Sequence, residues 1–246
     1  MDISIVIPAY NEEGNIKDGV LDAVSSYLNK QKYSWEVLIV DDASTDTTVQ
    51  LSEAFVKKHA GFRVLREPHR GKGGTVIAGV LAAKGEIILF ADMDQATPLN
   101  QVEKFFPKFK NGYDIVIGSR AGRKGAPILR KIMASGFVLL RTLILRLPYK
   151  DTQCGFKAIK KNTAKEIFKR MQIFNEKTKV DGAAVTAGFD LELLYIARKL
   201  KLKVAEVPVI WHHIGTERVS AIKDSWQGLR DMMRVRTNAL LGRYKG

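Results

Sequence analysis

Short apolar runs alternate with amphipathic stretches along the first half of the chain. The runs are rich in Ile, Val and Leu and predict buried strands, whereas apolar residues at every third or fourth position predict helices. The predicted strands comprise residues 3–8, 35–40, 62–66, 87–91 and 113–120. Strand–helix alternation is typical of right-handed βαβ units. We therefore expect an α/β fold in which helices flank a mostly parallel central sheet.

The second half of the chain alternates less regularly. Apolar periodicity predicts helices over residues 128–147, 161–171 and 188–200. A last strand is predicted over 203–211, and Pro208 places it at a sheet edge. From Ala221 the pattern is helical again. We expect a single domain over residues 1–215, with halves 1–118 and 119–215, followed by a basic helical tail over residues 216–246.

The predicted strand 87–91 runs directly into two carboxylates, Asp92 and Asp94. In an extended backbone, residues i and i+2 point to the same side, so both carboxylates can converge on one cation. A divalent ion held by one or two carboxylates, with other positions left for water and substrate phosphates, is typical of Mg²⁺ or Mn²⁺. Two acidic turn residues after a strand are the alternative, and this segment alone does not separate the two interpretations.

Acidic and aromatic side chains also follow the first two predicted strands. Tyr10 and Glu12 come after the first strand, and Asp41 and Asp42 come at the end of the second. In a parallel sheet, ligands bind outside the carboxyl ends of the strands. We therefore expect these residues to line one crevice with Asp92 and Asp94, which favours the metal-site interpretation.

A glycine-rich segment, residues 71–74, opens the helix that precedes strand 87–91. It lacks the Gly-Lys-Ser/Thr ending of a P-loop. No Gly-x-Gly-x-x-Gly follows the first strand, which argues against a dinucleotide dehydrogenase. The glycines instead predict a helix start close to a phosphate, with Lys72 adding positive charge.

The net charge of +14 over 246 residues predicts an anionic partner. The candidates are nucleic acid, an anionic membrane surface and a phosphorylated substrate. The pattern lacks interleaved aromatic and basic residues on exposed strands and lacks a recognition helix, so we expect no nucleic-acid binding. The single cysteine, Cys154, excludes an intrachain disulfide and fits a reducing, cytoplasmic setting. We expect neither a signal peptide nor a transmembrane helix.

The predicted helix 128–147 is amphipathic and basic. An arc of roughly 160° collects polar side chains, namely Arg130, Lys131, Ser135, Arg141, Thr142 and Arg146. Leu140 and Leu143 belong to the apolar side. Such a helix fits either a core-packed position with a solvated basic edge or a membrane interface. The tail from Ala221 has similar alternatives, a second membrane-facing helix or a homodimer contact.

Taken together, the motifs resemble those of the family 2 glycosyltransferases, which have the type A, Rossmann-like fold. The first-half motifs are Val-Ile-Pro-Ala-Tyr-Asn-Glu-Glu from Val6, Val-Asp-Asp-Ala-Ser-Thr-Asp from Val40 and Asp-Met-Asp from Asp92. The second-half motifs are Gly-Ser-Arg from Gly118, Asp-Thr-Gln-Cys-Gly-Phe-Lys from Asp151, Phe-Asp-Leu-Glu-Leu-Leu from Phe189 and Ala-Glu-Val-Pro-Val-Ile-Trp from Ala205. The latter are similar to polyprenyl-phosphate sugar transferases, and more to the dolichyl-phosphate β-glucosyltransferases than to the mannosyltransferases.

The resemblance implies roles for individual residues. The implied nucleotide-sugar ligands are Pro8, Ala9, Tyr10, Asn11, Glu12, Asp41, Lys72, Asp92 and Asp151. Asp92 and Asp94 are implied to hold the Mg²⁺ or Mn²⁺ ion that bridges the donor diphosphate. The implied ligands of the acceptor phosphate, whose geometry an Arg guanidinium matches, are Arg120, Arg130, Lys131, Ser135 and Arg218. The implied catalytic residues are Asp94, Asp190 and Arg120.

The implied reaction is an inverting displacement that moves a hexose to a dolichyl- or undecaprenyl-type phosphate at the cytoplasmic face of a membrane. UDP-glucose is the expected donor, and GDP-mannose is the alternative. A phosphate monoester has a second pKa of about 6 and is already an oxyanion near neutral pH, so we expect Asp190 to position rather than to remove a proton. A sugar hydroxyl acceptor is a further alternative, against which Arg120 and the loop from Asp151 argue. A membrane acceptor also favours an interfacial position for helix 128–147.

Overall fold

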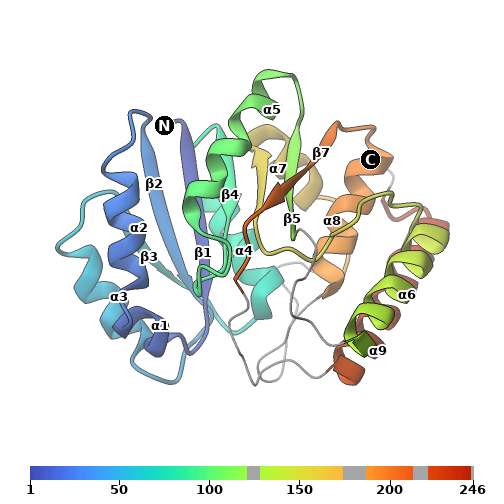
Figure 1. The fold of residues 1–246 in the computed structure, drawn as a ribbon, viewed down its shortest axis with the longest axis horizontal. Helices are drawn as coiled ribbons and strands as arrows, with labels where there is room; N and C mark the ends of the chain where they lie inside the picture. The colour runs from blue at the N-terminus through green and yellow to red at the C-terminus, as the bar shows by residue number, and fades with distance from the viewer. Residues whose placement is uncertain (121–127, 174–186, 213–220, 245–246) are drawn as a thin grey trace.

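The computed structural model describes residues 1–120, 128–173, 187–212 and 221–244, and of residues 128–135, 187 and 221–225 it describes the backbone alone. In the described chain, a seven-stranded sheet lies between two layers of helices (Figure 1). The expected α/β fold with a mostly parallel sheet is confirmed.

The sheet has the strand order β3-β2-β1-β4-β6-β5-β7. Its strands are β1 (Ile3–Ala9), β2 (Trp35–Asp41), β3 (Phe62–Arg66), β4 (Ile87–Phe90), β5 (Ile115–Arg120), β6 (Lys157–Lys160) and β7 (Val204–Val209). Only β6 is antiparallel to its neighbours, β4 and β5. β7 lies at the sheet edge, as Pro208 predicts. Strand β6 was not predicted, because its four residues follow a polar loop and carry no long alternating pattern.

Helices connect the strands. They are α1 (Glu13–Lys17), α2 (Val20–Leu28), α3 (Thr48–Val56), α4 (Gly71–Ala82), the 3₁₀ helix η1 (Leu99–Lys104), α5 (Phe106–Lys110), α6 (Ile128–Leu145), α7 (Lys161–Phe168), α8 (Ala187–Lys199) and α9 (Ala221–Leu240). Gly19, with a φ of +80°, separates α1 from α2. The N-cap residue of α1, Glu12, makes no side-chain cap hydrogen bond. The side-chain oxygen of Asn11, just before it, accepts the backbone N–H of Thr45 at 2.8 Å.

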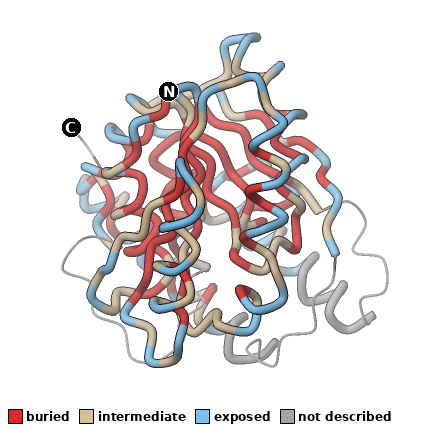
Figure 2. The backbone as a smooth tube through the Cα atoms, turned by 90° about the vertical axis from the view of Figure 1, so that its left-hand side faces the viewer, coloured by how far each residue is buried: buried red, intermediate tan, exposed pale blue. Residues whose placement is uncertain are grey.

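Two apolar cores cover the two faces of the sheet. Along β1, Ile5 and Ile7 face the layer that contains α1, α2 and η1, whereas Val6 faces the layer that contains α4, α7 and α8. Figure 2 shows the strands buried through the middle of the molecule. Helix α9 joins the second core through Met232 and Val235, both fully buried. Burial on both faces explains the nearly continuous apolar runs of the parallel strands.

The carboxyl ends of β1, β2 and β4 lie at one edge of the sheet, the lower edge in Figure 1. In register, Ala9 at the end of β1 lies opposite Asp41 at the end of β2. The N–H of Ala91, just beyond β4, donates to the carbonyl of Val6 in β1. The segments after these three strands therefore start side by side, as the crevice prediction requires.

Candidate active site

Asp92 follows β4 and is paired with a lysine from another element. Lys72, in the first turn of α4, donates a hydrogen bond from Nζ to Asp92 Oδ1. Burial alone would lower the pKa of Lys72, but the charges of Asp92, Asp190 and Asp94 outweigh it and the pKa is raised. The three carboxylates and this ammonium therefore lie within electrostatic reach of one another.

A glycine backs the carboxylate of Asp92. A Cβ atom at Gly155 would lie 1.9 Å from Asp92 Oδ2, so any other residue at this position would force the Asp92 carboxylate or the loop before β6 to move. Gln95 has a φ of +49°, and its side-chain amide donates to the carbonyl of Asp92 at 2.9 Å. Asp94 Oδ1 accepts the N–H of Ala96 at 2.9 Å. The chain after β4 thus forms a tight turn that holds both aspartates.

The two aspartates fit a magnesium or manganese ion. Within the described ranges, no group of three or more His, Cys, Asp and Glu side chains could hold a metal by itself. Mg²⁺ is usually bound by one or two carboxylates together with substrate phosphates and water, and Asp92 and Asp94 supply two. The ammonium of Lys72 on Asp92 Oδ1 marks this oxygen as one that attracts a cation. This donor set suits a hard divalent ion, which would need further oxygen ligands from substrate phosphates or water.

The loops after β1 and β2 are tied together on the expected nucleoside side. Asp41 is buried and accepts the N–H of Ser44 at 3.2 Å. The hydroxyl of Ser44 in turn accepts the N–H of Asn11 at 3.0 Å, and the N–H of Glu12 donates to Thr48 Oγ1 at 2.7 Å. The predicted nucleoside ligands that follow or end these two strands are Pro8, Ala9, Tyr10, Asn11, Glu12 and Asp41.

Tyr10 has an aromatic partner that sequence analysis missed. The rings of Tyr10 and His69 stack with their centroids 4.6 Å apart and their planes at 26°. His69 Nδ1 lies 2.9 Å from Asp42 Oδ2, and the buried Asp42 also accepts the N–H of Arg70 at 2.7 Å. His69 therefore enlarges the aromatic surface beside the nucleoside ligands. Its loop carries no motif, so the sequence offered no signal for it.

The expected acceptor side contains a buried bidentate ion pair. Arg120, the last residue of β5, donates from Nε to Asp151 Oδ2 at 2.7 Å and from Nη2 to Oδ1 at 2.8 Å. Burial alone would raise the pKa of Asp151, but the hydrogen bonds and charge of Arg120 lower it to about 2. Burial alone would lower the pKa of Arg120, and Asp151, with smaller contributions that include Asp92, raises it. Asp151 thus occupies two of the guanidinium donors that were predicted to face the acceptor phosphate.

Asp190, in the first turn of α8, is paired with Lys157 of β6. Lys157 Nζ lies 2.8 Å from Asp190 Oδ1, and the lysine is fully buried. Burial raises the pKa of Asp190, and the charges of Lys157 and Lys72 offset this only in part. The sequence predicted Asp190 as a site residue, but it gave Lys157 only as the last residue of the motif from Asp151, with no role and no strand.

Four predicted acceptor ligands are not placed by the structure. Arg218 lies outside the described residues. Arg130, Lys131 and Ser135 belong to α6, but their side chains lie outside the described part of the chain. Their role stays a prediction.

The described half of α6 faces the core differently from the expectation. Arg141, expected on the outer polar arc, is 1% exposed and donates to Thr152 Oγ1 at 2.9 Å and to the carbonyl of Tyr149. These acceptors lie in the loop before β6, and bonding them draws the Arg141 side chain inward. Thr142 and Arg146 of the same arc are exposed, and Leu139, Leu140 and Leu143 are exposed as well. The predicted outward position of Arg141 is therefore wrong.

Helix α9 lies beside α6 and also exposes apolar side chains (Figure 1). The exposed large apolar residues of α9 and the turn after it are Trp226, Met233, Leu240 and Leu241. No helix in the described ranges is both long enough and apolar enough to cross a bilayer.

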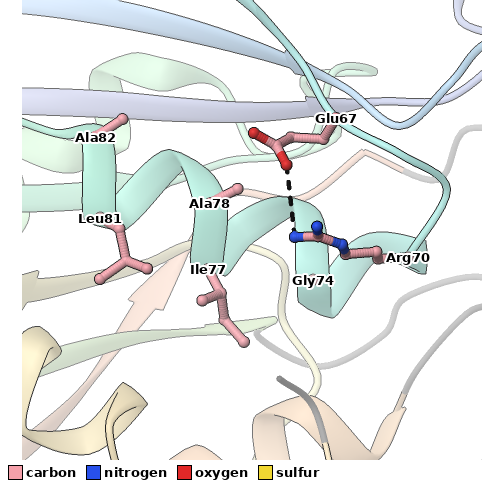
Figure 3. A pocket seen from close by; sticks show the side chains of 7 residues that line it. All are labelled: Glu67, Arg70, Gly74, Ile77, Ala78, Leu81 and Ala82. Atoms are coloured by element: carbon pink, nitrogen blue, oxygen red, sulfur yellow. Dashed lines mark ion pairs between the residues drawn. The ribbon is translucent and has the colours of Figure 1, made fainter. Parts of the chain in front are cut away.

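A cavity of about 240 Å³ lies beside α4, away from these residues. Figure 3 shows Arg70 and Glu67, whose charged groups are 3.5 Å apart, and the apolar side chains of Ile77 and Leu81 on the helix. The lining residues are Glu67, Arg70, Gly74, Ile77, Ala78, Leu81 and Ala82. None of the predicted site residues lines this cavity, so we place the candidate active site at the strand ends instead.

Comparison with known proteins identifies close relatives. The sequence model of the family described as Glycosyl transferase family 2 matches residues 4–168. A dolichyl-phosphate beta-glucosyltransferase from Dictyostelium discoideum is 35% identical over 262 residues, which cover 99% of this chain and 76% of that protein. The resemblance inferred from the motifs is confirmed.

Solved structures share the fold. Mannosyl-3-phosphoglycerate synthase from Rubrobacter xylanophilus has a TM-score of 0.70 at 17% identity, covering 100% of this chain and 76% of that one. A second structure is glucosyl-3-phosphoglycerate synthase from Mycobacterium tuberculosis in complex with Mn²⁺, UDP and glucosyl-3-phosphoglycerate. It has a TM-score of 0.61 at 20% identity, and the match covers 96% of this chain and 80% of that one. At these identities the likeness concerns the fold alone.

Proposed function

Because this chain belongs to glycosyltransferase family 2, we propose that it moves glucose from UDP-glucose to a polyprenyl phosphate. The observation that carries the proposal is the position of Asp92. Its carboxylate is paired with Lys72 and backed by Gly155, within electrostatic reach of Arg120 and Asp190. The name of the Dictyostelium relative supports glucose as the sugar and a dolichyl-type phosphate as the acceptor.

The donor side binds the nucleoside and the diphosphate. Tyr10 and His69 offer stacked rings for the base, and Asp41 is a carboxylate that can accept a base N–H. Asp92 and Asp94 would hold a Mg²⁺ or Mn²⁺ ion, which would stabilise the negative charge that develops on the leaving diphosphate. The ammonium of Lys72 supplies a further positive charge near the leaving diphosphate. These residues favour departure of the nucleoside diphosphate from the anomeric carbon.

The acceptor side presents an oxyanion that needs no deprotonation. A phosphate monoester with a second pKa of about 6 is ionised near neutral pH. One of its oxygens attacks the anomeric carbon from the side opposite the diphosphate, so one C–O bond forms as the other breaks and the configuration inverts. Arg120 orients the phosphate, and Asp151 in turn orients Arg120. Asp190 positions the reactants, since no proton has to be removed.

An exposed apolar and basic surface on α6 and α9 supports docking on an anionic bilayer. Leu139, Leu143 and Trp226 are 61%, 67% and 71% exposed, and Arg230 and Arg234 are exposed on the same helix as Trp226. Burying each large apolar side chain contributes about 1.5–3 kcal/mol, and each basic residue near anionic lipid contributes about 1 kcal/mol. Docking through this surface would bring the protein, with its net charge of +14, to the bilayer that contains its lipid acceptor.

A donor panel tests the reaction. The purified protein is incubated with UDP-glucose, UDP-galactose, GDP-mannose or GDP-glucose, a polyprenyl phosphate and Mg²⁺ or Mn²⁺, and the lipid-linked sugar is measured. We expect product with UDP-glucose, little with the others, and none after EDTA or with Asp94→Asn. Product with GDP-mannose alone would assign the mannosyltransferase alternative. Transfer to a free sugar hydroxyl but not to the lipid phosphate would contradict the proposed acceptor.

Vesicle flotation tests the docking surface. We expect the wild type to float with anionic vesicles at low salt, and the Leu139→Glu/Leu143→Glu variant to stay in solution. Leu81→Glu is the matched control, because Leu81 is also exposed, at 47%, but belongs to α4. Failure of the wild type to bind would contradict the proposal. A dimer in light scattering that only the double variant abolishes would make this surface a homodimer contact.

A further inference from the structure

Lys157 is a fully buried cation that the proposed reaction does not yet use. It is the first residue of β6, and in register it lies opposite Phe90, the last residue of β4. Because β6 is antiparallel to its neighbours, it begins at the edge of the sheet where β4 and β5 end. Lys157 therefore lies beside the point where the chain leaves β4 and enters the turn that carries Asp92.

The ammonium of Lys157 contacts three separate elements. Nζ lies 2.8 Å from Asp190 Oδ1 in α8, and it donates a hydrogen bond to the carbonyl of Cys154 in the loop before β6. It also lies 5.8 Å from the ring centroid of Phe90 in β4. The next residue after Cys154 is Gly155, which packs against Asp92. One ammonium thus joins α8, the loop that backs Asp92 and the strand that leads into Asp92.

A buried charge of this kind is costly unless its partners are in place. Removing one member of a buried ion pair leaves the other charge without compensation, whereas replacing both with neutral groups of similar volume is often close to neutral for stability. Stability alone therefore gives little reason to keep a buried ion pair at this place. The position of Lys157 and Asp190, between elements that meet at the candidate active site, instead suggests a role in the reaction.

We propose that Lys157 is a positioning residue for sugar transfer, which holds the Asp190 carboxylate in place at the candidate active site. The inference rests on the proposed function of this site. Lys157 itself has no exposed surface, so we expect it to touch neither substrate. It acts on the reaction through Asp190, so its loss lowers kcat and leaves the KM for the nucleotide sugar nearly unchanged.

The test is a double-mutant cycle with Lys157→Met and Asp190→Asn, in which kcat, KM and the melting temperature are measured for each variant. We expect each single variant to lose about 10²-fold in kcat, the scale of a displaced catalytic group. We expect the double variant to recover much of the melting temperature but to stay within about threefold of Asp190→Asn in kcat, because coupled residues are not additive. Arg63→Met is the control. It unpairs the buried Glu36 far from the site and lowers the melting temperature without changing kcat.

Two results would overturn the inference. If kcat of the double variant recovers along with its melting temperature, Lys157 and Asp190 serve stability alone. If the two losses in kcat multiply, Lys157 does not act through Asp190. Absence of lipid-linked sugar from the wild type with every donor in the panel would instead contradict the proposed function, so the two failures are distinguishable.

Discussion

Replacing Asp151 with asparagine removes one charge from a buried ion pair and keeps the shape of the side chain. In the folded protein Arg120 donates three hydrogen bonds to Asp151, at 2.7, 2.8 and 3.1 Å. Only 7% of the Asp151 side chain and 19% of the Arg120 side chain are exposed. An amide cannot accept both guanidinium N–H groups, so the charge of Arg120 stays buried without its partner.

The lowered pKa of Asp151 sets the size of the effect. It falls from the ordinary value of 3.8 to about 2. A tenfold change in proton affinity corresponds to about 1.4 kcal/mol, so ionised Asp151 contributes about 2 kcal/mol to the free energy of unfolding at pH 7. Unpairing a buried charge costs about 3–5 kcal/mol. We therefore expect Asp151→Asn to lose about 2–5 kcal/mol.

The pH dependence has a definite sign. Because the pKa of Asp151 is lower in the folded protein than in the unfolded chain, its contribution is complete above the unfolded value of 3.8. It is lost as the pH falls toward the folded value of about 2. The difference in unfolding free energy between the wild type and Asp151→Asn should therefore shrink when the pH is lowered from 7 to 3.

Urea unfolding at pH 7 and at pH 3 measures this difference. Glu53→Gln is the control, because Glu53 pairs with Arg66 on the surface, where the side chains are 41% and 62% exposed. Such pairs are worth about 0–1 kcal/mol. The reasoning is refuted if Asp151→Asn costs no more than Glu53→Gln, or if its cost grows toward pH 3.

Three further substitutions test other contacts. Gly155→Ala places a methyl group against the Asp92 carboxylate, so kcat should fall about 10²-fold and Mn²⁺ binding, measured by electron paramagnetic resonance, should weaken. The control Gly14→Ala, which has open space around its Cβ position, should change neither kcat nor Mn²⁺ binding. Asp190→Asn should reduce turnover less than Asp94→Asn, and the reverse order would assign proton abstraction to Asp190. Arg141→Met leaves the buried Thr152 hydroxyl and Tyr149 carbonyl without their donor, which should cost about 1–3 kcal/mol in thermal unfolding; no loss would contradict its structural role.

The sequence predicted the parts of the site that depend on local pattern and parallel topology. Apolar runs located β1, β2 and β4, and parallel strands end at one edge, so Tyr10, Asp41 and Asp92 had to come near one another. The first half of the chain was therefore largely predictable. The metal-site prediction for Asp92 and Asp94 assumed an extended backbone, whereas the structure ends β4 at Phe90 and places both residues in the turn that follows.

The contacts that were missed join residues distant in sequence. A helical wheel cannot reveal that Arg141 has buried acceptors in the loop before β6, and these acceptors draw its side chain inward. His69 was missed because its partner, Tyr10, belongs to a different loop. The pairing of Lys157 with Asp190 was missed because β6 is only four residues long and pairs with strands on both sides, so tertiary context rather than local propensity forms it.

The antiparallel insertion of β6 explains why the second half of the chain meets Asp92 at all. Had this strand run parallel to β4 and β5, its preceding loop would lie at the opposite edge of the sheet. Because it is antiparallel, residues 151–156 enter between the carboxyl ends of β4 and β5. Three carboxylates there each have a cation from a different segment, Lys72 for Asp92, Arg120 for Asp151 and Lys157 for Asp190. These three pairs span six segments of the chain and hold the charges in place before a substrate arrives, which is the preorganisation that stabilises charge developing in a transition state.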